Sequence, residues 1–113
     1  MNPQDWRTFI RSLDGEKPSE VLRVKEKIDP SHEITAFMTE LEKEGTAPVV
    51  IFDRVKGYSI PVVTNLSGSR KRLAMAFGVQ EKDLWAEYSR RMKSPIPEKV
   101  ITESPAREKV LTG

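Results

Sequence analysis

The sequence contains no cysteine and only one histidine, His32. The absence of cysteine excludes disulfide bonds, thiolate nucleophiles and zinc sites with sulfur ligands. A single histidine cannot form an intrachain pair of imidazole ligands, so this chain cannot build a histidine-rich metal site. His32 lies near the start of an expected helix, and a structural role is the simpler interpretation of it.

Long apolar runs are also missing. No run approaches the roughly 20 residues that a transmembrane helix needs, and residues 1–9 lack the basic and apolar regions of a signal peptide. We therefore expect no membrane association and a cytoplasmic location. The 19 basic residues nearly balance the 17 acidic ones, and the formal net charge of +2 predicts only weak attraction to nucleic acid.

The sequence does contain enough apolar residues for one folded unit. It has 113 residues, of which 37% are hydrophobic and 32% charged, and this is long enough for one compact domain but not for two. We expect residues 1–94 to form that domain. Residues 95–113 include three prolines and scattered apolar pairs, which predict an extended segment that packs on something else.

Apolar spacing predicts four short helices. Each combines apolar residues at helical spacing with a glycine, a proline or a capping residue at an end. We expect Asp29 to cap the second helix and Pro30 to occupy its first position. The four helices are expected over residues 3–13, 30–44, 70–77 and 79–92.

Three segments have the character of strands. Apolar and charged residues alternate from Leu22 to Ile28, and the runs at 48–52 and 60–64 are rich in β-branched residues. Gly57 lies between the last two runs, so we expect it to form the turn of a hairpin. The sequence thus predicts an α+β domain with about four short helices, a small, mostly antiparallel sheet and an extended C-terminal tail.

The turn before the third helix is the candidate binding site. Its small residues, Ser67, Gly68 and Ser69, leave backbone N–H groups free to meet an anion, and Arg70 and Arg72 lie close by. The same residues also suit an N-cap, and no glycine-rich phosphate-binding pattern accompanies them. Two interpretations stay open, an anion-binding corner and a turn that serves capping and packing.

Residues 70–93 offer a second alternative, because two short helices joined near Gly78 are similar to a helix-turn-helix motif. The second helix would then read DNA. Its exposed face includes Glu81, Asp83 and Glu87, which would repel phosphates. A small nucleic-acid-binding module is therefore the weaker hypothesis.

Three stretches resemble the N-terminal domain of the UbiD-type decarboxylases, which act on aromatic and α,β-unsaturated carboxylic acids. One is the opening helix, and another is residues 28–34, which read IDPSHEI. The most specific is residues 48–79, which read PVVIFDRVKGYSIPVVTNLSGSRKRLAMAFGV and follow the family's order of fixed positions. Ser67 departs from the family, which commonly has an aromatic residue there, so we expect the surface beneath it to be more open. The opening helix matches at Asp5, Phe9, Ile10 and Leu13.

The resemblance implies a non-catalytic N-terminal domain, or a small subunit, of an oligomeric decarboxylase or carboxylase. Its partner would be a flavin-binding domain or a larger catalytic chain, reached by residues 95–113 and their exposed apolar pairs. In the family, catalysis uses prenylated flavin mononucleotide (prFMN), a divalent metal and a potassium ion, held by the following domain. We therefore expect this chain to bind none of the three, to contain no catalytic residue and to be inactive alone.

Overall fold

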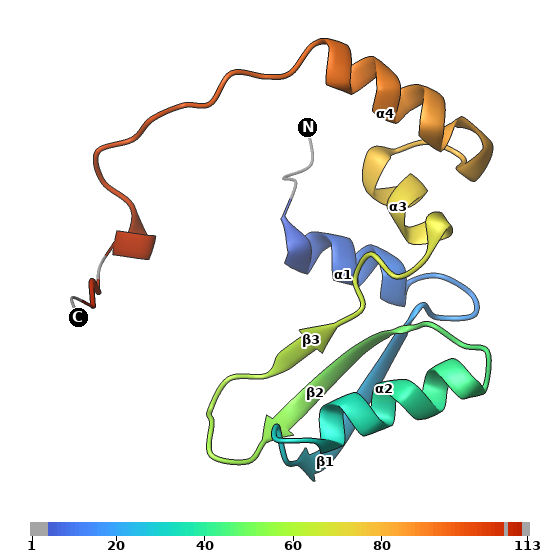
Figure 1. The fold of residues 1–113 in the computed structure, drawn as a ribbon, viewed down its shortest axis with the longest axis vertical. Coiled ribbons are helices and arrows are strands. Elements are labelled where there is room, and N and C mark those ends of the chain that lie inside the picture. Colours follow the sequence, from blue (N-terminus) through green and yellow to red (C-terminus); the bar gives the residue numbers. More distant parts are fainter. Residues whose placement is uncertain (1–4, 108, 112–113) are drawn as a thin grey trace.

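The computed structural model describes residues 5–107 and 109–111, which form a three-stranded sheet with four α-helices (Figure 1). This arrangement confirms the expected α+β class. Two single-turn 3-10 helices, η1 and η2, complete the described elements. In chain order these are α1 (Trp6–Asp14), β1 (Val21–Ile28), α2 (Glu33–Lys43), β2 (Val49–Val55), β3 (Val62–Thr64), α3 (Arg70–Phe77), η1 (Glu81–Asp83), α4 (Leu84–Lys93) and η2 (Pro105–Arg107).

The sheet is mixed, with the strand order β1-β2-β3. Strands β2 and β3 are antiparallel, with Phe52 opposite Val62, and Gly57 in their connection has a φ of +84°. The predicted hairpin is confirmed. Strand β1 instead runs parallel to β2, starting with Val21 opposite Val49. The sequence did not predict the direction of β1, and it is parallel to β2 because α2 returns the chain to its starting end as in a β-α-β unit.

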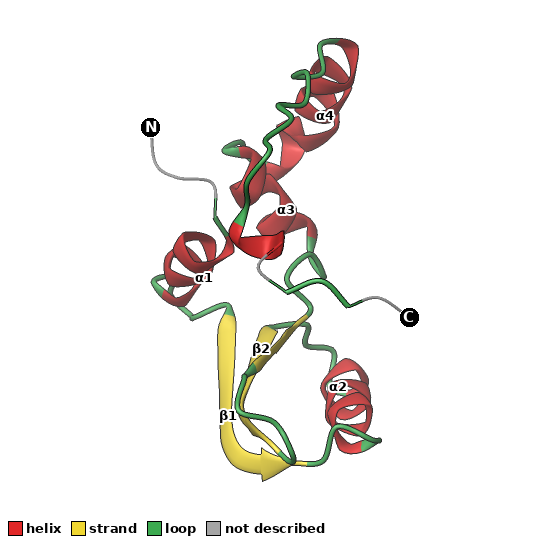
Figure 2. Ribbon diagram, turned by 90° about the vertical axis from the view of Figure 1, so that its left-hand side faces the viewer, coloured by secondary structure: helices red, strands yellow, loops and turns green. Residues whose placement is uncertain are grey.

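Strand β2 is the centre of the core. Its first four residues, 49–52, are all buried, and successive side chains of a strand point to opposite faces. The strand therefore buries apolar side chains on both faces of the sheet. On one face Phe52 meets Phe37 of α2 edge-on, with ring centroids 5.6 Å apart. Figure 2 shows α2 on this side of the sheet and α1 on the other side, near the start of β1.

Helices α1 and α4 begin later than predicted. Pro3, the expected start of α1, lies outside the described residues, and α1 begins at Trp6 after the cap residue Asp5. Helix α4 begins at Leu84 instead of Val79. Gln80 is extended, with φ −77° and ψ 154°, and the 3-10 turn η1 follows it, so the helical pattern is interrupted between α3 and α4.

Helix α2 also begins later, at Glu33, with His32 as its cap residue. The prediction that Asp29 caps this helix is wrong. Its carboxylate accepts a hydrogen bond from the Ser31 backbone N–H at 2.9 Å and another from Lys56 Nζ at 3.4 Å. Asp29 therefore stabilises a local turn ahead of the helix, which short acidic side chains commonly do.

The C-terminal part of the chain extends away from the sheet (Figure 1). Helix α4 packs on α3 and η1, and none of its residues is buried. The Cα radius of gyration is 17.3 Å, whereas a compact domain of this length has roughly 13 Å. The accessible surface is 9576 Å², whereas a compact protein of this mass exposes roughly 6,300 Å². The chain thus leaves far more surface uncovered than a self-contained domain does.

Candidate functional site at the corner before helix α3

The corner begins at Asn65, the residue after β3. Its φ of +64° is left-handed, a conformation that asparagine tolerates better than most residues. Its side-chain Nδ2 donates to the Pro48 carbonyl at 3.1 Å, and its own carbonyl accepts from the Gly68 N–H at 3.2 Å. A Cβ at Gly68 would overlap the Asn65 side-chain amide. Only glycine fits at this position without displacing Asn65.

Ser69 then starts helix α3. Its Oγ accepts a hydrogen bond from the Arg72 backbone N–H at 3.1 Å, which satisfies one of the free donors at the helix N-terminus. At the other end Gly78 closes the helix with a left-handed φ of +72°. Both predicted ends of this helix are confirmed.

Arg72 is the buried centre of the corner, with a side chain that is 1% exposed. Its Nε donates to the Leu66 carbonyl at 3.2 Å, its Nη2 to the Asn65 carbonyl at 2.9 Å and its Nη1 to Glu20 Oε2 at 3.2 Å. A buried charge must be paired and hydrogen-bonded to be tolerated. These contacts meet that requirement, so the guanidinium of Arg72 serves the fold and is not open to a ligand.

Glu20 links this corner to the start of β1. Its Oε1 accepts from Lys71 Nζ at 2.9 Å, and Lys71 also lies 3.4 Å from Glu16 Oε2. The hydrogen bond from Lys71, followed by that from Arg72, lowers the pKa of the Glu20 carboxyl. The same contact with Glu20 raises the pKa of Lys71. The corner is thus held by a connected set of charged groups, not by one ion pair.

The structure brings all five predicted site residues together, but it gives them different roles. Ser69 and Arg72 are bonded within the protein, while Ser67 and Arg70 are exposed. Gly68 borders a hollow of about 370 Å³ whose lining includes Glu42, and this carboxylate disfavours an anion there. The anion site stays a prediction, and it now depends on Arg70 and the backbone of the turn.

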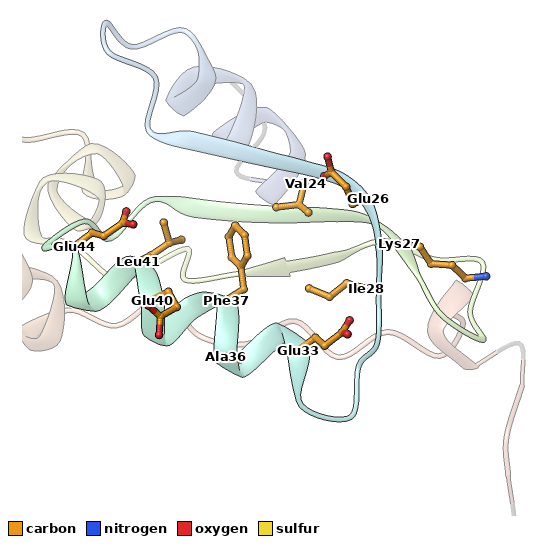
Figure 3. Close-up of a pocket in the computed structure, with 10 residues that line it drawn as sticks. All are labelled: Val24, Glu26, Lys27, Ile28, Glu33, Ala36, Phe37, Glu40, Leu41 and Glu44. Atoms are coloured by element: carbon orange, nitrogen blue, oxygen red, sulfur yellow. The ribbon is translucent and has the colours of Figure 1, made fainter.

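A larger groove of about 690 Å³ lies between β1 and α2 (Figure 3). Figure 3 shows Phe37 rising from α2 toward the sheet, with Val24 and Ile28 on the strand side. The lining contains no histidine or hydroxyl group, and its charged residues are mainly glutamates. The groove therefore has the character of a contact surface, not of a reaction site. Its remaining lining residues are Glu26, Lys27, Glu33, Ala36, Glu40, Leu41 and Glu44.

A third hollow, of about 320 Å³, lies between α3 and α4. The rings of Trp85 and Tyr88 stack at a centroid distance of 5.9 Å, and Tyr88 meets Phe77 edge-on at 6.3 Å. Apolar spacing correctly placed Trp85 and Tyr88 on one side of α4, yet they are 73% and 44% exposed. The lining consists of Arg70, Leu73, Phe77, Leu84, Trp85 and Tyr88.

Metal ligands do not gather anywhere in residues 5–107 and 109–111. Within these ranges no three histidine, cysteine, aspartate or glutamate side chains lie close enough together to hold a metal ion. The donor groups described here therefore do not fit a divalent metal. The same ranges contain no helix that is long and apolar enough to cross a membrane.

Comparison with known proteins connects these features to a family. The profile of the 3-octaprenyl-4-hydroxybenzoate carboxy-lyase N-terminal domain, UbiD_N, matches residues 14–92. The chain belongs to the UbiD family. The match includes the corner, the sheet and both helices of the α3–α4 pair, and it gives no support to a helix-turn-helix module at residues 70–93.

Relatives of known sequence are much longer than this UbiD-family chain. A phenolic acid decarboxylase of Sedimentibacter hydroxybenzoicus is 34% identical over 116 residues, which cover 96% of this chain and 24% of the relative. An uncharacterized protein of Aquifex aeolicus is 38% identical over 96 residues, which cover 83% of this chain and 19% of the relative. The chain thus spans about a quarter of these relatives or less.

Solved structures show the same likeness. Vanillic acid decarboxylase of S. hydroxybenzoicus in its closed form matches with a TM-score of 0.76 and 31% identity, covering 98% of this chain and 25% of that enzyme. An evolved dimeric form of the UbiD-class enzyme HmfF from Pelotomaculum thermopropionicum, in complex with prFMN, matches with a TM-score of 0.72 and 31% identity. That alignment covers 84% of this chain and 21% of HmfF.

Proposed function

We propose that this chain acts as the non-catalytic N-terminal domain, or a small subunit, of a UbiD-class decarboxylase or carboxylase. The substrate would be an aromatic or α,β-unsaturated carboxylic acid, and the role of this chain is to scaffold the flavin-binding domain. One observation supports the proposal most strongly: nearly the whole chain is similar to about a quarter of a decarboxylase.

The distribution of polar groups supports a scaffolding role. In the corner before α3, the most distinctive part of the sequence, Ser69 and Arg72 bond to the protein itself. Among the described residues, no buried side-chain nitrogen or oxygen lacks a hydrogen-bond partner. Groups that act on a substrate are usually left available for it, and the distinctive part of this chain instead maintains its fold.

Two segments of the chain would have separate roles in this scaffolding. Residues 1–94 form the compact unit, and residues 95–113 connect it to the flavin-binding domain or dock on that partner. The exposure of the tail supports this division, since the side chains of Ile96, Val100 and Ile101 are 92%, 85% and 55% exposed. Val110 and Leu111 are also exposed, and apolar side chains of this kind are stabilised when a partner covers them.

The cofactors would belong to the partner. HmfF has been solved with prFMN and with FMN, which supports a flavin in the complete enzyme. We propose that prFMN, the divalent metal and the potassium ion are all held outside this chain, consistent with the scattered donor groups described above. A cytoplasmic location and an oligomeric enzyme remain predictions.

A chimaera tests this function. The region of HmfF that matches this chain is replaced by these 113 residues, and a second HmfF variant lacks that region altogether. We expect the chimaera to retain FMN through gel filtration and the deletion variant to lose it. A chimaera that folds, as judged by circular dichroism, but retains no FMN would contradict the proposal.

A further inference from the structure

We propose that the α3–α4 face docks the flavin-binding domain by receiving an apolar side chain that has a carboxylate beside it. The α3–α4 face is defined as the six residues that line the 320 Å³ hollow, together with Met92, which follows Tyr88 by four residues on α4. This inference depends on the proposed function and adds the place of contact and the chemistry of the partner.

Three large apolar side chains of α4 are exposed to solvent. Trp85, Met92 and Tyr88 are 73%, 64% and 44% exposed, and they follow one another along α4 at helical spacing. Exposed apolar patches of this kind mark interaction surfaces, and tryptophan, tyrosine and arginine are enriched among the residues that dominate binding energy.

The rings are also held in place before any partner binds. Tyr88 stacks on Trp85 and meets Phe77 edge-on, while the Arg91 guanidinium lies 4.7 Å from the centroid of Phe77. Arg91 Nη2 further donates to the Phe77 carbonyl at 2.8 Å. A preformed hollow loses little side-chain entropy on binding, which favours a lasting contact.

Charge identifies the partner's chemistry. Arg70 is the only charged residue in the lining, and no ion pair joins it to another described residue. The nearby arginines differ, because Arg72 pairs with Glu20 and both Arg90 and Arg91 pair with Glu87. A carboxylate beside the incoming apolar group would complement Arg70.

The same charges argue against two other occupants. A second copy packed through the same face would bring no carboxylate to Arg70, because the lining contains none and the neighbouring Glu87 already pairs with Arg90 and Arg91. Nucleic acid would need several free cations, whereas this lining supplies one.

The area and position of the α3–α4 face fit a domain interface. The chain exposes roughly 3,000 Å² more than a compact protein of its mass, and interfaces between domains commonly bury about 600–1,500 Å². Helix α4 leads directly into the exposed tail at Ile96, so the two surfaces are continuous along the chain. One large partner can therefore cover both.

Hydroxyl-radical footprinting tests the contact directly, because tryptophan, tyrosine and methionine side chains are all oxidised readily when exposed. The oxidation rates of Trp85, Tyr88 and Met92 are compared in the isolated chain and in the FMN-loaded HmfF chimaera. We expect each to fall by roughly fivefold or more in the chimaera as the interface excludes water. Tyr58, which is 67% exposed on the β2–β3 connection, is the matched control and should keep its rate.

Unchanged rates at Trp85 and Tyr88 in an FMN-loaded chimaera would overturn the inference and leave the proposed function intact. Loss of FMN from the folded chimaera would instead contradict the proposed function itself. A charge variant gives a second test in the same chimaera. Arg70→Glu should release FMN during gel filtration and Arg70→Lys should retain it, while full retention by Arg70→Glu would rule out the carboxylate partner.

Discussion

Helix α3 contributes to two regions with opposite chemistry. In the corner before it, Arg72 is 1% exposed and donates to three protein acceptors. On the α3–α4 face, Trp85 is 73% exposed and stacks on the Tyr88 ring. The polar groups of the corner are paired within this chain, whereas we propose that a partner covers the α3–α4 face.

The largest effect is expected at Arg72. Arg72→Ala should lower the free energy of unfolding by about 3 kcal/mol or more, because it removes a buried, fully bonded cation and takes one hydrogen-bond donor from each of Glu20, the Asn65 carbonyl and the Leu66 carbonyl. Urea unfolding of the isolated chain measures this loss. Trp85→Ala is the control from the α3–α4 face and should cost about 0.5 kcal/mol or less. Equal losses for the two variants would remove the distinction between the regions.

Gly68 should show the next largest effect. Gly68→Ala forces Asn65 to move and to give up its hydrogen bond to Pro48, so we expect a loss of about 2 kcal/mol. Gly45→Ala is a matched control, because a Cβ at Gly45 would meet nothing within 4 Å, whereas the backbone there has a positive φ of +75°. It should cost about 1 kcal/mol through backbone strain alone. Thermal unfolding of both variants compares the cost of steric overlap with that of backbone strain. A smaller loss of stability for Gly68→Ala than for Gly45→Ala would contradict the packing of Gly68 against Asn65.

The helix cap should have a smaller effect. Ser69→Ala removes the acceptor of the Arg72 N–H, which should cost about 1 kcal/mol. Ser67→Ala, two residues earlier and exposed, should leave the unfolding free energy nearly unchanged. If denaturant unfolding shows the reverse order, Ser69 does not cap α3.

The smallest effects should appear in the dependence of stability on pH. Hydrogen bonds from Arg90 and then Arg91 lower the pKa of Glu87 to about 2, and contacts with Lys71 and then Arg72 lower that of Glu20. A carboxyl whose pKa is lowered in the folded state stabilises the protein at pH values above 4.5, the ordinary pKa of glutamate. That contribution is lost as the pH falls through the folded-state value.

Titration followed by NMR should therefore find each carboxyl more than half ionised at pH 4.5. Glu20→Gln and Glu87→Gln should each flatten the fall in stability below pH 4.5. A Glu87 carboxyl that titrates near 4.5 would show that the two arginines do not hold it in solution.

Local patterns in the sequence predicted much of this fold. The apolar run at β2, the turn at Gly57 and both ends of α3 depend on neighbouring residues, and the structure confirms them. The direction of β1 could not be predicted in this way, because alternation indicates which side chains face the core but not which way a strand runs. Direction is set by the path of α2.

The site was harder to predict for a related reason. Glu20 and Arg72 are 52 positions apart, so no local pattern connects them, and the sequence favoured capping at the corner but left anion binding open. The spacing of Trp85 and Tyr88 indicated an apolar side of α4. It could not indicate whether this chain or a partner covers that side, because both produce the same periodicity.

We propose that this UbiD-family domain supports a flavin site without containing one. The most direct test is to mix the purified 113-residue chain with prFMN and a divalent metal, pass it through gel filtration and record the flavin absorbance of the protein peak. We expect the flavin to separate from the protein. Co-elution of one flavin per chain would contradict it.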